Sequence, residues 1–227
     1  MSSVYSQISF GKVASRYNKI NAIPKTAAFQ LGETLAGLVP AGSRVLDMGC
    51  GAGRVTLPAA AKGLHVVGVD ISHPMLQEAH RLAAETPFDP VHANALALPL
   101  GNRPFTAVLS INILHLVPQW QAVIANAIRL MKPNAIFVQG RDWLDPASCA
   151  GRLRFKLREV VMGLAPGLRP TAAASPAVMA QFLDQLGGTT TEPIVATRWT
   201  TPISPAKVLD QMANREHNEP WMLSDAL

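Results

Sequence analysis

The sequence predicts an α/β fold with a doubly wound, mostly parallel sheet, and two observations lead to this class. Short apolar segments with strand character alternate with helical segments from Arg44 to Arg141, and strands joined by helices pair in parallel with helices on both faces. A glycine-rich turn also follows the first strand directly. In sheets of this kind, ligands bind outside the carboxyl ends of the strands.

The elements follow one another in a regular order. We expect helices at 24–38, 54–62, 74–85 and 119–131, and strands at 44–48, 65–70, 105–111 and 135–141, with a further strand segment near Val91. Pro24 suits a helix start because its missing N–H is not needed there, and Gly63 ends the second helix. The valine-rich strand 65–70 has no polar alternation, which indicates burial on both faces.

The turn after the first strand carries Gly49, Gly51 and Gly53. Alternate glycines let the backbone adopt conformations closed to other residues and approach a ligand closely, and the next helix presents free N–H groups at its start. Asp70 ends the second strand 17 residues after Gly53 (70 − 53), about where a doubly wound fold places the carboxylate that holds a ribose. These features predict a nucleoside-containing cofactor across the ends of the first two strands.

The glycine spacing points to one cofactor family. The nicotinamide fingerprint is G-x-G-x-x-G, but here Arg54 follows a G-x-G-x-G run, and the sequence has no Tyr-x-x-x-Lys pair. This run, with Asp47 before it, resembles the class I S-adenosylmethionine-dependent methyltransferases. Segments 91–100, 107–118 and 128–135 are similar, in the same order, to later motifs of that family. The overall pattern is most similar to the small-molecule branch that includes the ubiquinone and menaquinone biosynthesis methyltransferases.

The resemblance implies S-adenosyl-L-methionine as methyl donor and S-adenosyl-L-homocysteine as product. The three glycines would cradle the methionine end, Asp47 would order the loop, and Asp70 would bind the ribose hydroxyls. Asn94 would meet the adenine; the family usually carries an aspartate there, and asparagine keeps one carbonyl acceptor without the charge. The implied cofactor-binding set is Tyr17, Asp47, Gly49, Gly51, Gly53, Asp70, Ile71, Met75, Asn94, Ala95 and Ser110.

Some members of this set have packing as an alternative role. Tyr17 lies in a segment that forms a short helix over the cofactor in the resembling family, and it would otherwise pack against the first helix. Ile71 and Met75 stand where the family packs apolar side chains on the adenine, and ordinary core packing explains them equally. Ser110 begins the stretch Ser-Ile-Asn, which stands where methyltransferases acting on the amino groups of nucleic acid or glutamine carry an N-P-P-Y-type motif.

The chemistry of methyl transfer needs few catalytic residues. The reaction is an in-line displacement, so the protein mainly aligns donor and acceptor and excludes water. A general base helps where the acceptor is a hydroxyl or amine that must lose a proton. His115, just after the fourth strand, is the candidate for this catalytic role, with a purely structural histidine as the alternative. No His, Cys or Asp cluster has metal-ligand spacing, so we expect no metal.

The regular alternation stops after Arg141, and the last third of the chain is less clear. We expect an N-terminal helical segment over the cofactor site at 1–42, a Rossmann-like core at 43–144 and 187–227, and a helical lid insertion at 145–186. A surface helical pair without ligand contact is the alternative to the lid. Residues 189–201 are predicted as one long strand or a hairpin. Either this segment supplies both final strands of a seven-stranded sheet, or the seventh strand is lacking and another subunit covers the exposed sheet edge. Trp221 and Met222, near the end of the sequence, are the candidates for a homodimer contact.

The composition limits the expected cellular location and the expected binding partners. The chain has 227 residues, a net charge of +5 and a pI of about 9.6. It has no apolar run long enough to span a membrane and no signal-peptide pattern, so we expect a cytoplasmic protein. A basic, apolar-interleaved segment at 152–158 is either a solvated helix face or a binding patch. The nucleic-acid hypothesis rests on the pI alone.

The function expected from these features is S-adenosylmethionine-dependent methyl transfer to a small organic acceptor, at oxygen, carbon or nitrogen. The alternative is a non-catalytic or partner-dependent methyltransferase-like protein that binds the cofactor and acts by association. Asn94 and the incomplete strand pattern near the C-terminus support that alternative.

Overall fold

The computed structural model describes residues 14–164 and 175–214. Five strands form one sheet in the order β3-β2-β1-β4-β5, and all four pairings are parallel. This arrangement confirms the predicted doubly wound α/β class. The strands are β1 (Arg44–Met48), β2 (His65–Asp70), β3 (Phe88–His92), β4 (Phe105–Ile111) and β5 (Met131–Gly140).

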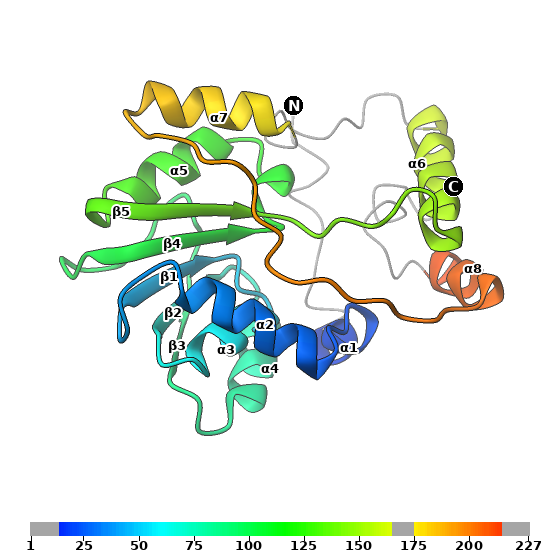
Figure 1. Cartoon of the computed structure of the whole chain (residues 1–227), viewed down its shortest axis with the longest axis horizontal. Coiled ribbons are helices and arrows are strands. Elements are labelled where there is room, and N and C mark those ends of the chain that lie inside the picture. The colour runs from blue at the N-terminus through cyan, green and yellow to red at the C-terminus, as the bar shows by residue number, and fades with distance from the viewer. Residues whose placement is uncertain (1–13, 165–174, 215–227) are drawn as a thin grey trace.

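Helices cover both faces of the sheet (Figure 1). One face carries α2 (Lys25–Ala36), α3 (Thr56–Ala60) and α4 (His73–Ala83), and the other carries α5 (Trp120–Ile128) and α7 (Pro176–Gln185). The remaining elements are α1 (Ala14–Ile20), the short 3₁₀ helix η3 (Leu114–Leu116), α6 (Cys149–Leu164) and α8 (Pro205–Ala213). Two apolar cores result, one on each side of the central strands.

The central strands β1, β2 and β4 are buried on both faces, as their continuous apolar sequences predict. Alternate residues of each strand enter the two cores. Leu46 and Val108 pack on the α5 side, whereas Val45 and Leu109 pack on the α2 side. The strands are therefore clamped between two helical layers, which fixes the positions of their carboxyl ends.

The helix after the glycine turn is shorter than predicted. It was expected over 54–62, but it begins at Thr56 and ends at Ala60. Pro58 lies in its first turn, where the missing N–H breaks no intrahelical bond. The Pro58 carbonyl lies so close to Gly32 of α2 that a Cβ there would clash with it at 2.3 Å. A glycine at this position lets α2 and α3 pack at backbone contact.

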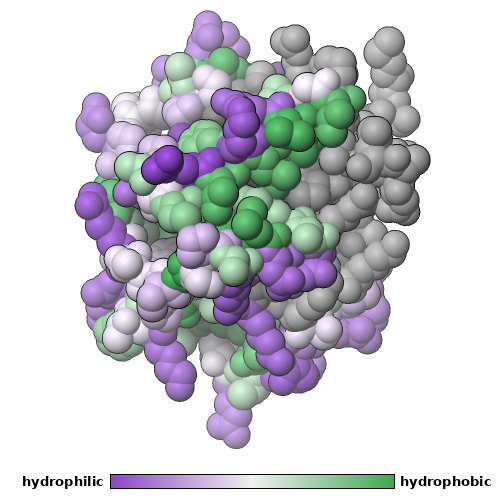
Figure 2. Space-filling view, turned by 90° about the vertical axis from the view of Figure 1, so that its right-hand side faces the viewer, coloured by the Kyte–Doolittle hydropathy of each residue, from purple (hydrophilic) through white to green (hydrophobic). Residues whose placement is uncertain are grey.

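Helix α7 belongs to the core of the molecule. Its Met179 is 4% exposed and joins the same apolar cluster as Trp120 of α5, and the Phe182 ring meets the Trp120 ring edge-on at 5.0 Å. The segment 145–186 is thus divided: α7 covers a sheet face, while α6 lies beyond the carboxyl ends of the strands with α8 beside it (Figure 1). Figure 2 looks onto that end of the molecule.

The prediction of a strand or hairpin at 189–201 is wrong. No strand occurs between α7 and α8 in the described structure. Pro193 removes a ladder donor, and side chains of α2 hold this segment instead: the Thr34 hydroxyl donates to the Ala196 carbonyl at 2.9 Å, and the Thr197 hydroxyl bonds Gln30 at 3.0 Å.

Consequently β5 is one edge of the described sheet. The suggested dimer contact at Trp221 and Met222 lies outside the described residues. Among the residues that the structure describes, no helix is long and apolar enough to cross a bilayer.

Candidate cofactor site

The glycine turn is held against the end of β2 by the backbone. The N–H groups of Gly49 and Cys50 both donate to the Val69 carbonyl, at 2.8 and 3.1 Å. Gly51 and Gly53 have φ of +54° and +79°, a region that strains residues with a Cβ. A Cβ on Gly53 would also lie 2.8 Å from Leu57, whereas one on Gly51 would meet nothing within 4 Å. The turn is therefore packed on its inner side and open at Gly51.

Asp70 closes the turn from the neighbouring strand. One carboxylate oxygen accepts the Gly51 N–H and the other accepts the Ser72 N–H, each at 2.8 Å. Burial raises the pKa of Asp70, and the backbone hydrogen bonds oppose that rise. Each carboxylate oxygen has more than one acceptor position, so both can still accept hydroxyl hydrogens of a ribose.

Asp47 braces the turn from below. Its carboxylate is 2% exposed and accepts the hydroxyl hydrogen of Thr56, the first residue of α3. Burial raises the pKa of Asp47 to about 7; the Thr56 hydrogen bond lowers it, and the charge of Asp70 raises it further. The two ends of the turn are thus fixed by two carboxylates, the buried Asp47 and the partly buried Asp70.

Helix α1 lies over the turn on the side predicted for the cofactor. The Asn18 amide donates to the Ala52 carbonyl at 2.9 Å, and Tyr17 packs on a small cluster of Ala14, Ala52 and Met75. Burial raises the pKa of Tyr17. Met75 is 2% exposed, so it supports α1 and the turn from within this cluster.

The residues predicted for the adenine end follow β2 and β3. The side chain of Ile71 is 68% exposed, and the Asn94 amide oxygen accepts the Leu96 N–H at 2.9 Å, forming a turn that includes Ala95. His92, for which the sequence predicts no role, places its Nε2 2.9 Å from the Ile71 carbonyl oxygen. His92 therefore helps to fix the corner that follows Asp70.

Ser110 and His115 lie at the carboxyl end of β4. Ser110 pairs in register with Met48 at the end of β1. Its hydroxyl is buried and has no hydrogen-bond partner among the described residues, and such a group is costly unless a ligand or water satisfies it. His115 is half-buried in η3.

An ion pair that the sequence did not predict joins the turn to the segment just after β5. Arg54 Nη2 lies 2.6 Å from Asp142 Oδ2, and the Arg54 side chain is only 12% exposed. The Asn112 side-chain oxygen accepts the Asp142 N–H at 3.2 Å. The only sequence signals were a charged residue after the glycines and another after the fifth strand. Their contact spans 88 residues of chain and depends on the strand order.

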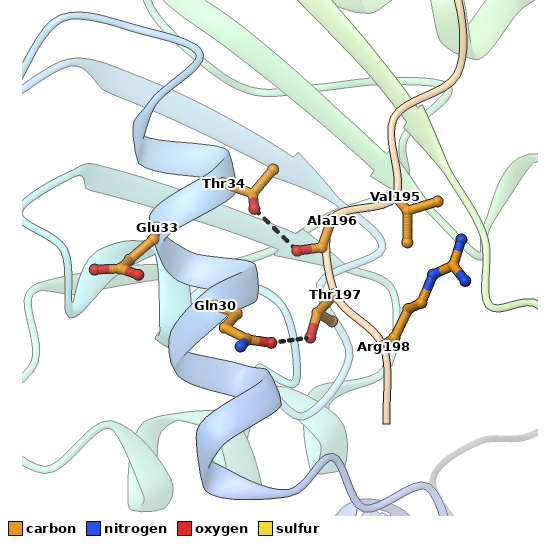
Figure 3. A pocket seen from close by; sticks show the side chains of 7 residues that line it. All are labelled: Gln30, Glu33, Thr34, Val195, Ala196, Thr197 and Arg198. Carbon is orange, nitrogen blue, oxygen red and sulfur yellow. Dashed lines mark hydrogen bonds between the residues drawn. The ribbon is translucent and has the colours of Figure 1, made fainter. Parts of the chain in front are cut away.

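A separate pocket lies between α2 and the segment that follows α7 (Figure 3). Gln30 and Thr34 point toward that segment and hydrogen-bond it, while Glu33 points away. None of the predicted site residues lines this pocket; it is lined by Gln30, Glu33, Thr34, Val195, Ala196, Thr197 and Arg198. Over residues 14–164 and 175–214, no group of three or more His, Cys, Asp or Glu side chains is placed to hold a metal.

Comparison with known proteins matches part of the chain to a methyltransferase family. Residues 45–134 match a family described as "Methyltransferase domain". The chain is 33% identical over 138 residues to 27-O-demethylrifamycin SV methyltransferase of Amycolatopsis mediterranei (strain S699), covering 58% of this chain and 50% of that one. It is also 33% identical over 133 residues to demethylmenaquinone methyltransferase of Clavibacter sepedonicus, covering 57% and 54%. The chain thus spans about half the length of these curated relatives.

A solved structure extends the likeness of fold beyond this region. Magnesium protoporphyrin IX methyltransferase from Synechocystis PCC 6803, with bound SAH, has a TM-score of 0.58 and 21% identity, covering 81% of this chain and 89% of that one. The shared fold therefore includes most of the chain.

Proposed function

We infer that residues 45–134, which match a family described as "Methyltransferase domain", are a class I S-adenosylmethionine-dependent methyltransferase domain, and we propose that the protein transfers a methyl group to a small organic acceptor. One observation carries the proposal. One oxygen of the Asp70 carboxylate holds the glycine turn through the Gly51 N–H, and the other holds the Ser72 N–H just after β2. A carboxylate at this place is the group that doubly wound folds use to bind a ribose.

The residues present fit the methyl donor. Asp70 keeps acceptor positions for two ribose hydroxyls, Gly51 leaves its side of the turn open, and Ser110 presents a buried hydroxyl that lacks a partner among the described residues. In this proposal Gly49, Gly51 and Gly53 hold the methionine end. Tyr17 and Ser110 complete that end, while Ile71, Met75, Asn94 and Ala95 form the adenine side.

When bound, S-adenosylmethionine supplies a methyl group that its sulfonium charge already activates. The residues of this chain then align the donor with the acceptor and exclude water. Helices α6 and α8 lie beyond the carboxyl ends of the strands (Figure 1), and in this proposal they cover the acceptor as a lid. His115, after β4, takes the proton of a hydroxyl or amine acceptor.

Two observations support a small organic acceptor. The two curated relatives are named as methyltransferases of demethylrifamycin and demethylmenaquinone. The N-P-P-Y-type motif is replaced by Ser110-Ile111-Asn112, which does not favour amino groups of nucleic acid. The non-catalytic alternative also binds the cofactor, so the intact turn fits both hypotheses; the names of the relatives, which are methyltransferases, favour the enzyme.

The test measures S-adenosylhomocysteine formation with a panel of phenols, carboxylic acids and amines. We expect turnover with at least one class. For a hydroxyl or amine acceptor, His115→Gln should lower kcat about 100-fold or more, with the donor KM unchanged. His80→Gln, an exposed histidine of α4, is the matched control. Donor binding without turnover on any acceptor class would contradict the proposal and favour the non-catalytic alternative.

A further inference from the structure

Helix α6 presents an outward face on which basic and large apolar side chains stand together. Residues four apart share one side of a helix, so one row begins with Arg152 and Lys156 and continues with Val160 and Leu164. Val161 is only 1% exposed and lies on the inward side, with Arg158 and Leu164 three residues away at the edges of the exposed surface. We call this exposed surface the α6 face; it consists of Arg152, Phe155, Lys156, Arg158, Val160, Met162 and Leu164.

The apolar members of the α6 face are open to solvent. Phe155, Val160 and Leu164 are 53%, 49% and 52% exposed. The aromatic Trp143, 74% exposed, precedes a turn at Asp145 that packs against the first turn of α6. In Figure 2, which views the molecule from this side, hydrophobic side chains gather in a patch with hydrophilic ones beside them. Folding alone does not account for so many exposed large side chains on one short segment.

The charge of the same helix has one sign. Its residues carry four basic side chains and one acidic one, Glu159, which pairs with Lys156 at 2.8 Å. Arg152 and Arg158 are exposed and form no ion pair with any residue in the described ranges. The α6 face is therefore both positively charged and apolar, with the basic residues in its first half and aliphatic residues in its second half.

We propose that the α6 face binds the surface of anionic phospholipid bilayers. Basic residues attract anionic headgroups, while apolar and aromatic residues of an amphipathic helix bury in the headgroup–acyl boundary. A purely electrostatic partner, such as a nucleic-acid backbone, would leave Val160, Met162 and Leu164 exposed. Because α6 lies beyond the carboxyl ends of the strands (Figure 1), a bound bilayer would lie on the same side as the cofactor turn.

The test is co-sedimentation of the full chain with vesicles of phosphatidylcholine, with or without phosphatidylglycerol, in the absence of methyl donor and acceptor. We expect preferential binding to the mixed vesicles. Arg152→Glu with Arg158→Glu should weaken that binding about tenfold or more. Arg103→Glu with Lys132→Glu makes the same charge change at the amino ends of β4 and β5 and should bind like the parent.

A second pair of variants tests the apolar contribution. Val160→Ser with Leu164→Ser should also reduce vesicle binding severalfold, whereas Leu82→Ser with Val178→Ser, each 38% exposed on α4 and α7, should not. Circular dichroism checks that all four variants fold. Equal binding to both vesicle types, or binding that is indifferent to the α6 substitutions, would overturn the proposal. Loss on charge reversal alone would also overturn it and indicate an acidic macromolecule. Because no donor is present, these outcomes are independent of the methyl-transfer proposal.

Discussion

The buried Asp47 and the partly buried Asp70 hold the glycine turn from two sides. Asp70 receives the Gly51 N–H from the side of β2, and Asp47 receives the Thr56 hydroxyl hydrogen from the side of α3. Burial raises the pKa of both groups. Ionising them in the folded protein therefore costs more than ionising them in the unfolded chain.

This cost gives the protein a pH-dependent stability. The pKa of Asp47 is about 7 in the folded protein against 3.8 in its ordinary state, so between these values the folded state binds more protons than the unfolded state. Stability therefore falls as pH rises through this window. Asp47→Asn should remove on the order of 2 kcal/mol of that fall between about pH 4 and pH 8.

The measurement is chemical denaturation of the parent and the variant at several pH values. Asp89→Asn, an exposed aspartate of β3, is the control and should keep the parental pH slope. Parallel profiles for the parent and Asp47→Asn would show that Asp47 is ionised in the folded protein at little cost.

At the residue scale, the sequence predicted the residues of the glycine turn and its neighbouring strand end, but not the contacts between residues far apart in the chain. The glycines and Asp70 lie where expected because the carboxyl ends of the adjacent parallel strands β1 and β2 lie at the same edge of the sheet. The Arg54–Asp142 ion pair and the support of Ile71 by His92 were not predicted. They depend on side-chain directions and on pairings between elements far apart in the chain.

At the scale of elements, α7 shows how a correct helix can have an unexpected place. The sequence predicted helical structure within 145–186, and in the structure Ser175 caps the start of α7 by accepting the Val178 N–H. Its placement on α5, through Met179 and the Phe182–Trp120 ring contact, was not predicted. Its apolar stripe fits a sheet face or a lid equally well by periodicity alone.

Met179→Ala tests whether α7 is part of the cooperative core. Truncating this buried side chain should lower the free energy of unfolding by about 2–4 kcal/mol. Val178→Ala, at the exposed neighbouring position of the same helix, should change it by less than about 1 kcal/mol. Urea unfolding followed by circular dichroism measures both. A small effect of Met179→Ala would mean that α7 is only loosely attached.

The prediction of a strand at 189–201 was wrong because local sequence does not reveal the tertiary neighbours of a segment. Its β-branched composition favours a strand, but Pro193 and the side chains of Gln30 and Thr34 place its hydrogen bonds on α2. Local propensity did not reveal which neighbour would receive those bonds. The β5 edge therefore carries no further strand in the described structure.

At the scale of the whole molecule, the parallel pairing of all five strands brings the polar residues of the candidate cofactor site to the carboxyl edge of the sheet. Asp70 and Ser110 lie at the carboxyl ends of β2 and β4, and the glycine turn and Asp142 follow the carboxyl ends of β1 and β5. Helices α6 and α8 lie on that same side (Figure 1). The fold class and this end of the sheet were predicted because periodicity and glycine spacing encode them. The sequence pattern is weakest outside residues 45–134, the part of the chain that matches the methyltransferase domain family, so the sequence predicts no particular acceptor.

The most direct test of the proposed function is calorimetric titration with S-adenosylmethionine and S-adenosylhomocysteine. The parent protein should bind both. Asp70→Asn, which replaces one of two acceptor oxygens with a donor, should bind at least about tenfold more weakly, as expected for hydrogen bonds to a charged group. Asp89→Asn should bind like the parent. If well-folded parent protein binds neither ligand, or if Asp70→Asn binds as tightly as the parent, the cofactor does not bind at this end of β1 and β2.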